Sequence, residues 1–188
     1  MTDKTKQKIM DTALKIFAER GYTGATTKAL AEEAGFSEMT LFRKFKSKEN
    51  LFNMVLLQNR EKIINDLDSI FIFEDIQDPR DFLKSFIEGV IDLIDRNFEC
   101  ISILVQGNPE IFPVMKGSNS IFFSKMGENM ANLKIFQNSN IDLKFFAFNL
   151  ITFSYFIVLD KYRGQNSLNR DELIKEFINC SAKYFELK

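Results

Sequence analysis

The sequence contains no histidine and no tryptophan, and only two cysteines and three prolines in 188 residues. Without histidine, histidine-based acid–base catalysis and histidine metal sites are excluded. Cys100 and Cys180 fall in different predicted helices without the spacing of metal ligands, so we expect buried free thiols rather than a disulfide or redox pair. We therefore predict no catalytic residue, no metal site and no cofactor.

Long apolar segments are also scarce. No basic start followed by an apolar run resembles a secretory signal, and no segment approaches the uninterrupted apolar length that a membrane span needs. We expect a cytoplasmic protein with no membrane partner.

The net charge of −1 conceals an uneven distribution. Residues 1–52 hold ten Lys and Arg against seven Asp and Glu, a net charge of +3, and the remaining residues carry −4. A basic segment joined to an acidic one is typical of a nucleic-acid-binding module attached to something else. Many solvated helices carry as much charge, so an ordinary solvated surface is an alternative to a nucleic-acid-binding module.

Residues 26–48 (TTKALAEEAGFSEMTLFRKFKSK) carry the most informative pattern, which is two short helices joined by a tight turn. Thr26 or Thr27 can cap the first helix, because a hydroxyl accepts a backbone N–H that a helix start leaves unpaired. Gly35 stands where a left-handed residue ends the helix, and Ser37 can cap the next helix two residues later. So short a connection makes the helices cross steeply, which predicts a helix-turn-helix.

The second helix is expected to run from about Glu38 to Phe45. Leu41 and Phe45 are four residues apart and can pack inward, while Thr40, Arg43 and Lys44 face away. One side of this helix is therefore expected to hold it in place, and the other to read DNA.

Many residues in this region match one known family in register: Ala13, Phe17, Gly21, Tyr22, Thr26, Thr27, Ala31, Ala34, Gly35, Ser37, Thr40, Leu41, Phe45, Ser47, Lys48, Glu49 and Leu51. Through them the chain resembles the TetR-type transcriptional regulators of bacteria and archaea, over roughly residues 6–52. A bare helix-turn-helix pattern is a weak signal, whereas this many matches in register is a strong one. Beyond Leu51 the resemblance is one of helix count and order.

The rest of the chain reads as helices, with breaks at prolines, glycines and asparagines and no alternating strand pattern. Helices are predicted over 5–20, 47–69, 79–97, 98–106, 119–136, 142–163 and 170–186, with a possible extra turn at 109–116. We predict an all-α fold, with a three-helix DNA-binding headpiece and a larger helical domain for effector binding and dimerisation. The domain boundaries are 1–48 and 49–188.

The resemblance also nominates DNA-contacting residues, because in this family the start of the first motif helix and the exposed face of the second contact DNA. Carried over residue by residue, these are Thr26, Thr27, Lys28, Ser37, Glu38, Met39, Thr40, Phe42, Arg43, Lys44, Lys46 and Lys48. Arg43 can fork onto a guanine edge, and Thr40 can touch a thymine methyl. Thr27, Lys46 and Lys48 suit phosphate contacts, with capping or solvation as the alternative.

Two of these positions depart from the family pattern. Phe42 stands where tyrosine is usual, so only van der Waals contact with the DNA backbone remains, or partial burial. Met39 stands where a small or polar residue is common, which favours apolar contact with a base methyl or a looser sequence preference. Glu38 can accept from a cytosine amino group, although the helix dipole explains an acid there equally well.

The resemblance places an effector site among the middle helices. The residues expected to line it are Phe86, Val90, Ile103, Gln106, Phe122, Phe123, Met126, Met130, Phe148, Asn149, Thr152 and Tyr155. Apolar walls with a few polar groups suit a small hydrophobic molecule, and ordinary core packing is an equally good explanation for any single residue. Asn149, Thr152 and Gln106 carry more weight, because burying an unpartnered amide or hydroxyl is costly.

Residues 145–159 (FFAFNLITFSYFIVL) are apolar nearly all round, which predicts burial on more than one side. In the family, the last two long helices form a dimeric four-helix bundle. The resemblance assigns this role to two faces, one with Phe148, Thr152, Tyr155, Phe156 and Leu159, and the other with Ile174, Phe177, Ile178, Ser181 and Phe185. Packing inside one subunit is the alternative for each of these residues.

These observations predict a homodimeric transcriptional regulator that binds a palindromic double-stranded operator and is released by a small hydrophobic effector. Repression is the usual outcome in the family, and activation stays open. The alternative is a helical protein-interaction module without an effector, whose basic headpiece docks an acidic partner. An enzyme is disfavoured, because the sequence offers no nucleophile–base pair, metal cluster or phosphate loop.

Overall fold

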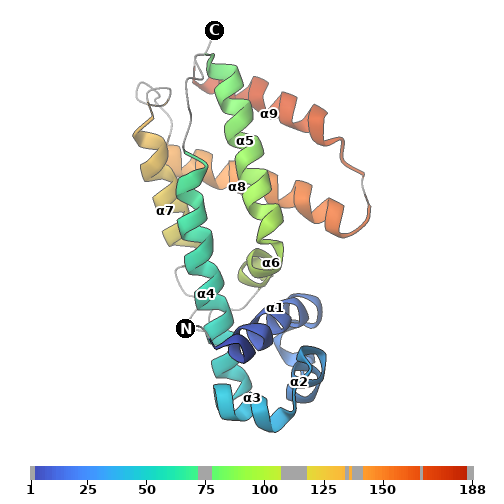
Figure 1. Ribbon diagram of the computed structural model, residues 1–188. Coiled ribbons are helices and arrows are strands. Elements are labelled where there is room, and N and C mark those ends of the chain that lie inside the picture. Colours follow the sequence, from blue (N-terminus) through green and yellow to red (C-terminus); the bar gives the residue numbers. More distant parts are fainter. Residues whose placement is uncertain are drawn as a thin grey trace. The chain divides into compact units, whose positions relative to one another are not determined.

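The computed structural model describes residues 3–71, 78–106, 118–133, 136, 142–165 and 167–185, and the regular elements in these ranges are all helices. The all-α prediction is therefore confirmed. The helices are α1 (Lys4–Gly24), α2 (Thr27–Ala34), α3 (Glu38–Phe45), α4 (Lys48–Ser69), α5 (Pro79–Arg96), α6 (Phe98–Gln106), α7 (Ser118–Ala131), α8 (Leu143–Tyr162) and α9 (Arg170–Tyr184) (Figure 1).

The helices assemble into two compact units. The first unit consists of Met1–Lys62 and Asn97–Ser118, and the second of Ile63–Arg96 and Asn119–Lys188. Helix α4 is continuous, so its start belongs to the first unit and its end to the second. The predicted boundary between residues 48 and 49 separates the expected DNA-binding domain from the expected effector-binding and dimerisation domain, and it does not coincide with the division into compact units. It stays a prediction.

The first unit is organised around α1, whose buried side chains recur at helical spacing. Ile9, Ala13 and Phe17 on α1 are almost wholly buried. The Phe17 ring meets the Phe52 ring of α4 edge-on, with centroids 4.9 Å apart, and Tyr22 meets the same ring at 5.0 Å. These rings attach the end of α1 to α4 within the unit.

A glycine interrupts α1 near its end. Gly21 has a φ of 67°, in the left-handed region that side chains adopt only with strain. The sequence predicts a stop there, and the structure has a kink instead. The chain closes one more turn beyond it, because the Ala25 N–H donates to the Gly21 carbonyl at 3.2 Å.

The two cysteines lie in different surroundings. Cys100 on α6 is buried, and this burial raises the pKa of its thiol to about 12. Cys180 on α9 is exposed, so the prediction of two buried thiols is wrong for Cys180. Its neighbours Ile178, Ser181 and Ala182 are the buried residues of that part of α9.

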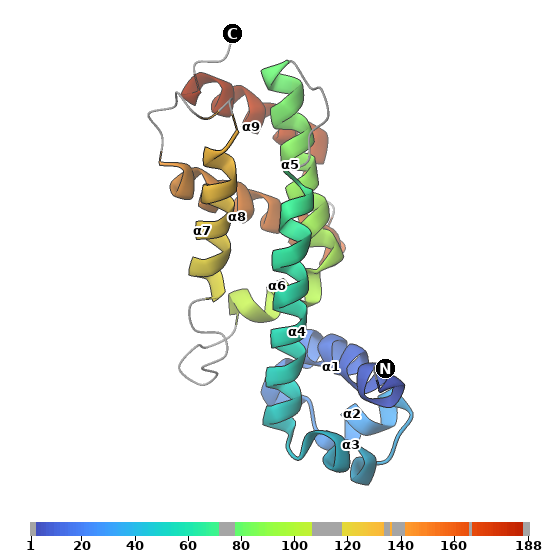
Figure 2. The ribbon, with the colours of Figure 1, turned by 60° about the vertical axis from the view of Figure 1, so that its left-hand side comes forward.

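The second unit is held together by phenylalanine rings. Helix α5 lies across α8 and α9 (Figures 1 and 2). The Phe185 ring lies 4.8 Å from Phe136 and 4.9 Å from Phe146, centroid to centroid, and Phe153 stacks on Phe177 at 4.4 Å. Such pairs contribute about 0.5–1.5 kcal/mol each beyond the burial of their surface. Many of the 21 phenylalanines thus serve the core.

Helix α8 has a buried side and an exposed apolar side. Its buried residues are Phe146, Ala147, Leu150, Ser154, Tyr155, Ile157, Val158 and Asp160. On the opposite side, Phe145, Phe148 and Phe156 are 63%, 49% and 56% exposed. With Thr152 and Leu159 at the same three- and four-residue spacing, they form one strip, called here the α8 stripe.

The composition of α8 corrects one expectation. Leu143–Tyr162 is long and apolar enough to cross a membrane by length and composition, although the sequence was expected to contain no such segment. The core helix of a soluble protein passes the same test, and 39% of this helix is buried within the chain. The α5 and α9 contacts of its inner side identify α8 as a core helix of the second unit.

The face of α9 that was considered for a partner subunit packs within its own chain. Ile174, Ile178, Ser181 and Phe185 are all less than 9% exposed, and Tyr155 on α8 is 7% exposed. For these residues, the structure supports the alternative of packing inside one subunit. Phe145, which was not assigned to a dimer face, instead belongs to the α8 stripe.

An aspartate organises the connection after α8. Asp160 accepts a hydrogen bond from the Ser167 hydroxyl at 2.6 Å and another from the Leu168 N–H at 3.1 Å. These bonds, the first above all, hold the pKa of the Asp160 carboxyl below its ordinary value. The carboxylate therefore anchors the loop that leads into α9.

The remaining helix ends agree with the sequence to within a few residues, except in α7. This helix ends at Ala131 rather than at Phe136, which lies in a separate short turn and contacts Phe82 at 6.1 Å between ring centroids. The predicted extra turn over 109–116 lies outside the described residues.

Candidate nucleic-acid interface

The helix-turn-helix is fixed by its own side chains. The Thr26 hydroxyl accepts from the Ala29 N–H at 3.1 Å and begins α2, and the Ser37 hydroxyl accepts from the Thr40 N–H at 3.3 Å and begins α3. Gly35 ends α2 with a φ of 78°, and its N–H bonds back to α2. The cap predicted at Thr26 or Thr27 is Thr26, and the cap predicted at Ser37 and the glycine turn between the helices are confirmed.

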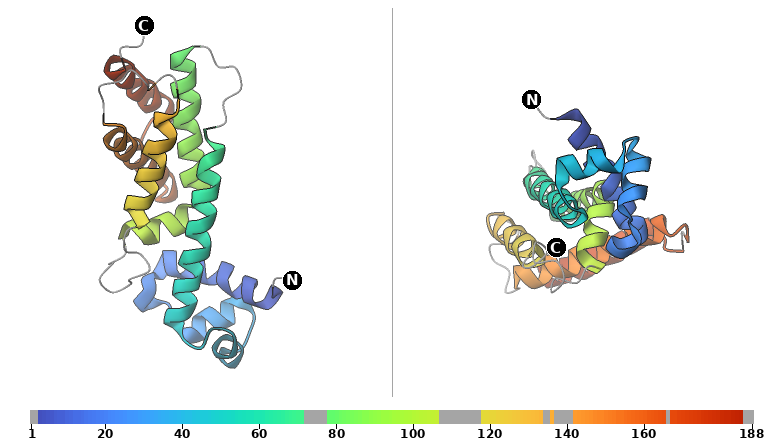
Figure 3. Two further views of the ribbon diagram at one scale, coloured as in Figure 1. Left: turned by 90° about the vertical axis from the view of Figure 1, so that its left-hand side faces the viewer. Right: turned by 90° about the horizontal axis from the view of Figure 1, so that it is seen from below.

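The two sides of α3 differ sharply in burial. Leu41 and Phe45 are fully buried, which confirms the predicted inner face. On the other side, Met39 is 81% exposed and Phe42 is 44% exposed. In the view from below in Figure 3, α3 lies in front of the other helices of its unit. The exposed face of α3, with Met39 and Phe42, is therefore free to enter a groove of DNA.

Arg43 is exposed beside Met39 and Phe42. Among the described residues, no hydrogen bond or ion pair joins its guanidinium to another group. A planar guanidinium without an internal partner keeps its donors for an external acceptor, such as a guanine edge or a phosphate.

Lys46 closes α3 in an unusual conformation. Its φ of 68° and ψ of −39° place an ordinary side chain in the left-handed half of the backbone map, while its N–H donates to the Phe42 carbonyl at 2.8 Å. The strain of such a residue is about 1–3 kcal/mol. The exposed Lys46 side chain is held by this turn at the end of α3.

Two predicted DNA-contacting residues bond to each other. The Thr27 hydroxyl donates to the Glu38 carboxylate at 2.5 Å, which joins the start of α2 to the start of α3. Ser37 and Thr40 form a second polar pair, with their hydroxyl oxygens 3.1 Å apart. The starts of both helices thus present a connected polar group rather than separate side chains.

Lys44 pairs with a residue far away in the sequence. Its ammonium bonds to the carboxylate of Asp3, the residue that caps α1. The bond from Lys44, followed by the one from the Lys6 N–H, holds the pKa of the Asp3 carboxyl below its ordinary value. The side chain of Lys44 remains 29% exposed.

Lys48 is also engaged within the unit. Its ammonium donates to the Tyr22 carbonyl at 3.0 Å and lies 4.3 Å from the centroid of the Tyr22 ring. This arrangement combines a hydrogen bond with a cation–π contact. By contrast, Lys28 is highly exposed, and its ammonium lies 4.0 Å from the Glu32 carboxylate.

Asp3 and Tyr22 take part in these contacts, although neither was predicted as a site residue from the sequence. An aspartate just before a helix is a recognisable capping signal, so Asp3 could have been identified as a cap. Its bond to Lys44 joins residues 41 apart, and the Lys48–Tyr22 bond joins residues 26 apart. No local pattern predicts such long-range contacts.

The residues expected to line an effector site have varied surroundings. Phe86 and Val90 on α5, and Met126 and Met130 on α7, are fully buried in the second unit, and the rings of Phe123 and Phe148 lie 5.4 Å apart. Ile103 is buried on α6, which belongs to the first unit. Gln106 and Phe122 lie outside the described side chains.

The polar members of that set are not buried as the sequence analysis assumed. Asn149 is exposed, and its amide donates to the Phe145 carbonyl of its own helix at 2.8 Å, while Thr152 is half-buried. The fully buried polar side chain of α8 is instead Ser154, and among the residues that the structure describes its hydroxyl oxygen has no hydrogen-bond partner. A hydroxyl in this state is the kind of group that a bound molecule satisfies.

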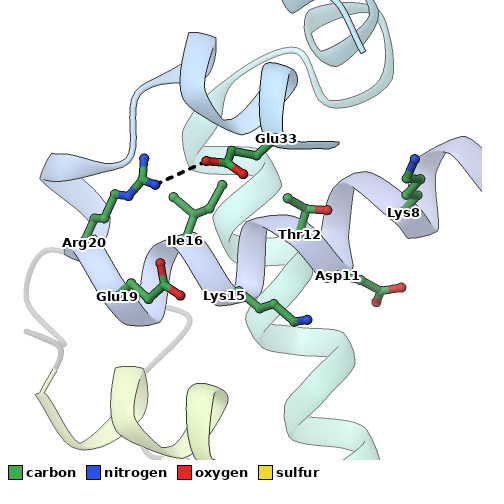
Figure 4. Close-up of a pocket in the computed structure, with 8 residues that line it drawn as sticks. All are labelled: Lys8, Asp11, Thr12, Lys15, Ile16, Glu19, Arg20 and Glu33. Atoms are coloured by element: carbon green, nitrogen blue, oxygen red, sulfur yellow. Dashed lines mark hydrogen bonds and ion pairs between the residues drawn. The ribbon is translucent and has the colours of Figure 1, made fainter. Parts of the chain in front are cut away.

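Among the described residues of the first unit, α1 borders two grooves that include no residue of the predicted effector site. One, of about 330 Å³, lies between α1 and α2 and is crossed by the Arg20–Glu33 ion pair at 3.3 Å (Figure 4). The other, also of about 330 Å³, lies between α1 and α4 and is largely apolar, with Met10, Met54 and Leu57 in its walls.

Comparison with known proteins supports the helix-turn-helix interpretation. Residues 9–55 match the family of bacterial regulatory proteins of the tetR type. The chain is 42% identical over 55 residues to the HTH-type transcriptional regulator YvkB of Bacillus subtilis, covering 29% of each chain. It is 24% identical over 132 residues to the regulator UidR of Escherichia coli K12, covering 67% of this chain and 64% of that protein.

The similarity to YvkB and UidR thus spans less than two thirds of either relative. Another relative, the transcriptional repressor AcnR of Corynebacterium diphtheriae, is 47% identical over 47 residues, which cover 25% of each chain. High identity is therefore confined to short matches.

Solved structures share the fold over nearly the whole chain. The fatty acid degradation regulator FadR from Bacillus halodurans has a TM-score of 0.70 and 14% identity, covering 95% of both chains. AibR, solved in complex with isovaleryl coenzyme A and operator DNA, has a TM-score of 0.69 and 16% identity, covering 98% of this chain and all of that one. At such identities the likeness concerns the fold alone.

Proposed function

Because residues 9–55 match the tetR family of bacterial regulatory proteins, we propose that this chain is a homodimeric repressor of the TetR type that binds a palindromic operator and is released by a small hydrophobic effector. The matched residues 9–55 contain the helix-turn-helix, which supports a role in DNA binding and transcriptional regulation. The homodimer, the palindrome, the effector, a cytoplasmic location and a role without catalysis are parts of the proposal.

The observation that carries this function is the two-sided character of α3. Leu41 and Phe45 anchor the helix, and Met39, Phe42 and Arg43 point to solvent. In the major groove, Arg43 would donate to guanine, and the Met39 side chain would contact a thymine methyl. Phe42 lacks a hydroxyl and would pack against the sugar–phosphate backbone.

The polar and cationic residues around α3 would set the position of the protein on the duplex. Lys28 and Lys46 are exposed and would bind phosphates, together with the hydroxyls near the starts of α2 and α3. Phosphate contacts of this kind fix register and orientation without reading sequence. Thr26 and Ser37 contribute as caps that hold the two helices in place.

The homodimer is supported by the α8 stripe. Phe145, Phe148 and Phe156 are about half exposed or more on a helix whose other side is core. An apolar strip of this length is unfavourable in water, and a second copy of the same helix would cover it with equally apolar surface. A two-fold pair would place two α3 helices about 34–36 Å apart for successive major grooves.

The effector is proposed to bind inside the second unit. Phe86, Val90, Met126 and Met130 would supply apolar walls, and the buried hydroxyl of Ser154, which has no hydrogen-bond partner among the described residues, would supply one polar group. Release of DNA requires a coupling of only about 1–3 kcal/mol between the two sites. Helix α4 is the proposed route, because one continuous helix has residues in both units.

The direct test is a gel shift with DNA taken from upstream of the gene, combined with sedimentation of the complex. We expect retardation of the upstream duplex at concentrations that leave scrambled duplex free, and two chains for each bound operator. A monomer that binds one half-site would contradict the homodimer. No retardation at low salt would contradict the whole proposal.

The effector part is tested separately by a thermal-shift screen of lipophilic compounds. A compound that raises the melting temperature is expected to release the retarded DNA in proportion to its binding. Ser154→Ala serves as a probe of the site, because it removes the buried hydroxyl with little change in volume. Compounds that stabilise the protein without releasing DNA would contradict the proposed coupling.

A further inference from the structure

One contact in the first unit connects the beginning of α1 with the end of α3. The Asp3 carboxylate has two functions at once. Its Oδ1 atom accepts from the N–H groups of Thr5 and Lys6, at 3.1 and 3.3 Å, and so caps α1. Its Oδ2 atom accepts from the Lys44 ammonium.

Lys44 differs in this respect from the other cations of α3. The guanidinium of Arg43 has no partner among the described residues, and Lys46 is exposed. Lys44 is paired, and its side chain is only 29% exposed. An ammonium has three donors and binds carboxylate and phosphate oxygens in the same way, as a point charge. Asp3 therefore occupies Lys44 as a DNA phosphate would.

A cation that is already paired adds little to the attraction between a protein and DNA. Each phosphate that a protein neutralises releases counterions from the duplex, and this release drives binding that does not depend on sequence. When Lys44 meets a phosphate, it must first give up Asp3, and the freed carboxylate then faces the DNA backbone. The pair thus removes one positive charge from the phosphate-binding surface.

We propose that Asp3 is an internal counterion that withholds Lys44 from DNA phosphates and so lowers the affinity of the protein for DNA of arbitrary sequence. This inference rests on the proposed function, because it assumes that α3 meets DNA. Arg43, without an internal partner, keeps its full contribution to base reading. The pair thereby raises the ratio of specific to non-specific binding.

The test is the substitution Asp3→Asn, measured on random-sequence duplex over a range of salt concentrations. Asparagine caps helices about as well as aspartate, so the variant keeps the cap and loses the charge. We expect tighter binding at low salt, and a plot of log K against log salt that is steeper by about 0.9 for each bound headpiece. Between about 50 and 200 mM salt, this slope difference changes the ratio of the variant's binding constant to that of the wild type by about 3.5-fold for each bound headpiece.

Two further variants make the test specific. Asp11→Asn removes the same charge from the same helix, but Asp11 accepts from the Gln7 amide at 2.8 Å and has no ion pair among the described residues. Its effect on slope and affinity is expected to be smaller than that of Asp3→Asn. In the Lys44→Gln background, Asp3→Asn is expected to bring no gain over Lys44→Gln alone.

Three outcomes would overturn the inference while leaving the proposed function intact. They are an equal effect of Asp3→Asn and Asp11→Asn, a gain that persists without Lys44, and weaker binding by Asp3→Asn at an unchanged melting temperature. Failure of the wild-type protein to retard any DNA at low salt would instead contradict the proposed function, so the two failures are distinguishable.

Discussion

Helices α3 and α8 both expose large apolar side chains, but in different surroundings. On α3, Met39 and Phe42 stand among Arg43, Lys44 and Lys46. On α8, the exposed phenylalanines belong to a strip whose members carry no charge, and the cations Lys144 and Lys161 stand only at the two ends of the helix. Apolar groups framed by positive charges match a DNA groove bordered by phosphates, whereas an uncharged, mostly apolar strip matches another apolar surface.

The ends of the two helices differ as well. Helix α3 ends in a strained residue, Lys46, and α8 is followed by a loop that Asp160 anchors. Exposure of an apolar side chain therefore does not by itself define the partner that covers it. The charges beside an exposed residue, and the way its helix is held, indicate what that residue meets.

The largest effect is expected from placing charge on the α8 stripe. The double substitution Phe148→Glu and Phe156→Glu should separate the subunits, because four carboxylates would meet across the proposed two-fold interface. Losing the second half-site should weaken operator binding by about 10²–10⁴-fold. Sedimentation equilibrium and gel shifts measure the two effects.

The control is Val105→Glu, which places a charge on another exposed apolar residue, 52% exposed on α6. This variant should remain dimeric. A double α8 variant that stays dimeric, with an unchanged helical circular dichroism spectrum, would show that the stripe has another role.

The next largest effect is expected from removing the unpaired cation of α3. Arg43→Ala should cost about 1–3 kcal/mol in operator affinity and relax the base preference at one position in each half-site. Competition gel shifts with single-base operator variants measure this change. Arg20→Ala is the matched control, because that guanidinium pairs with Glu33 at 3.3 Å. Equal losses in the two variants would contradict base reading by Arg43.

A smaller effect is expected at the end of α3. Lys46→Gly should raise the free energy of unfolding by about 1 kcal/mol, because glycine adopts a positive φ without strain. Lys46→Ala loses the same charge but keeps a β-carbon, so it should show no such gain. Urea unfolding of both variants separates the effect of the backbone conformation at residue 46 on the free energy of unfolding from the effect of the lost charge. A stabilisation that is equal in the two would mean that charge, rather than conformation, is responsible.

The smallest effect is expected at the loop after α8, and it depends on pH. Folding lowers the pKa of Asp160, so its carboxylate stabilises the fold above the ordinary pKa of about 3.9, and this contribution is lost as pH falls below that value. Asp160→Asn lacks this ionisation. The difference in melting temperature between wild type and variant should therefore narrow from about pH 6 to about pH 3.

Removing the main hydrogen-bond donor to Asp160 gives an independent check. In a Ser167→Ala background, the effect of Asp160→Asn on the melting temperature should depend less on pH. The reason is that the Ser167 hydroxyl is the first cause of the lowered pKa of Asp160. A difference between wild type and Asp160→Asn that stays constant with pH would contradict the assignment.

The first unit was largely predictable because its helices begin and end at local signals. Thr26, Gly35 and Ser37 act within three or four residues of themselves, so the sequence places both motif helices correctly. The burial of Leu41 and Phe45 follows from their spacing. Contacts such as Thr27–Glu38 and Lys44–Asp3 could not be predicted, because they depend on how separate helices pack.

The second unit was predictable as a set of helices but not as a surface. Residues 145–159 are apolar nearly all round, so periodicity does not say which side of α8 is core. Packing against α5 and α9 decides this: it buries Tyr155 and leaves Phe145 exposed. The face of α9 shows the same limit, because an apolar face alone does not tell an inner contact from an outer one.

The unequal environments of the two cysteines give this protein a built-in chemical handle. At neutral pH, a maleimide reagent meets the exposed thiol of Cys180, while burial and a pKa of about 12 keep Cys100 unreactive. A fluorophore or spin label can therefore be attached at one site of the native sequence. Mixing donor-labelled and acceptor-labelled protein would then report subunit exchange by energy transfer, without any substitution.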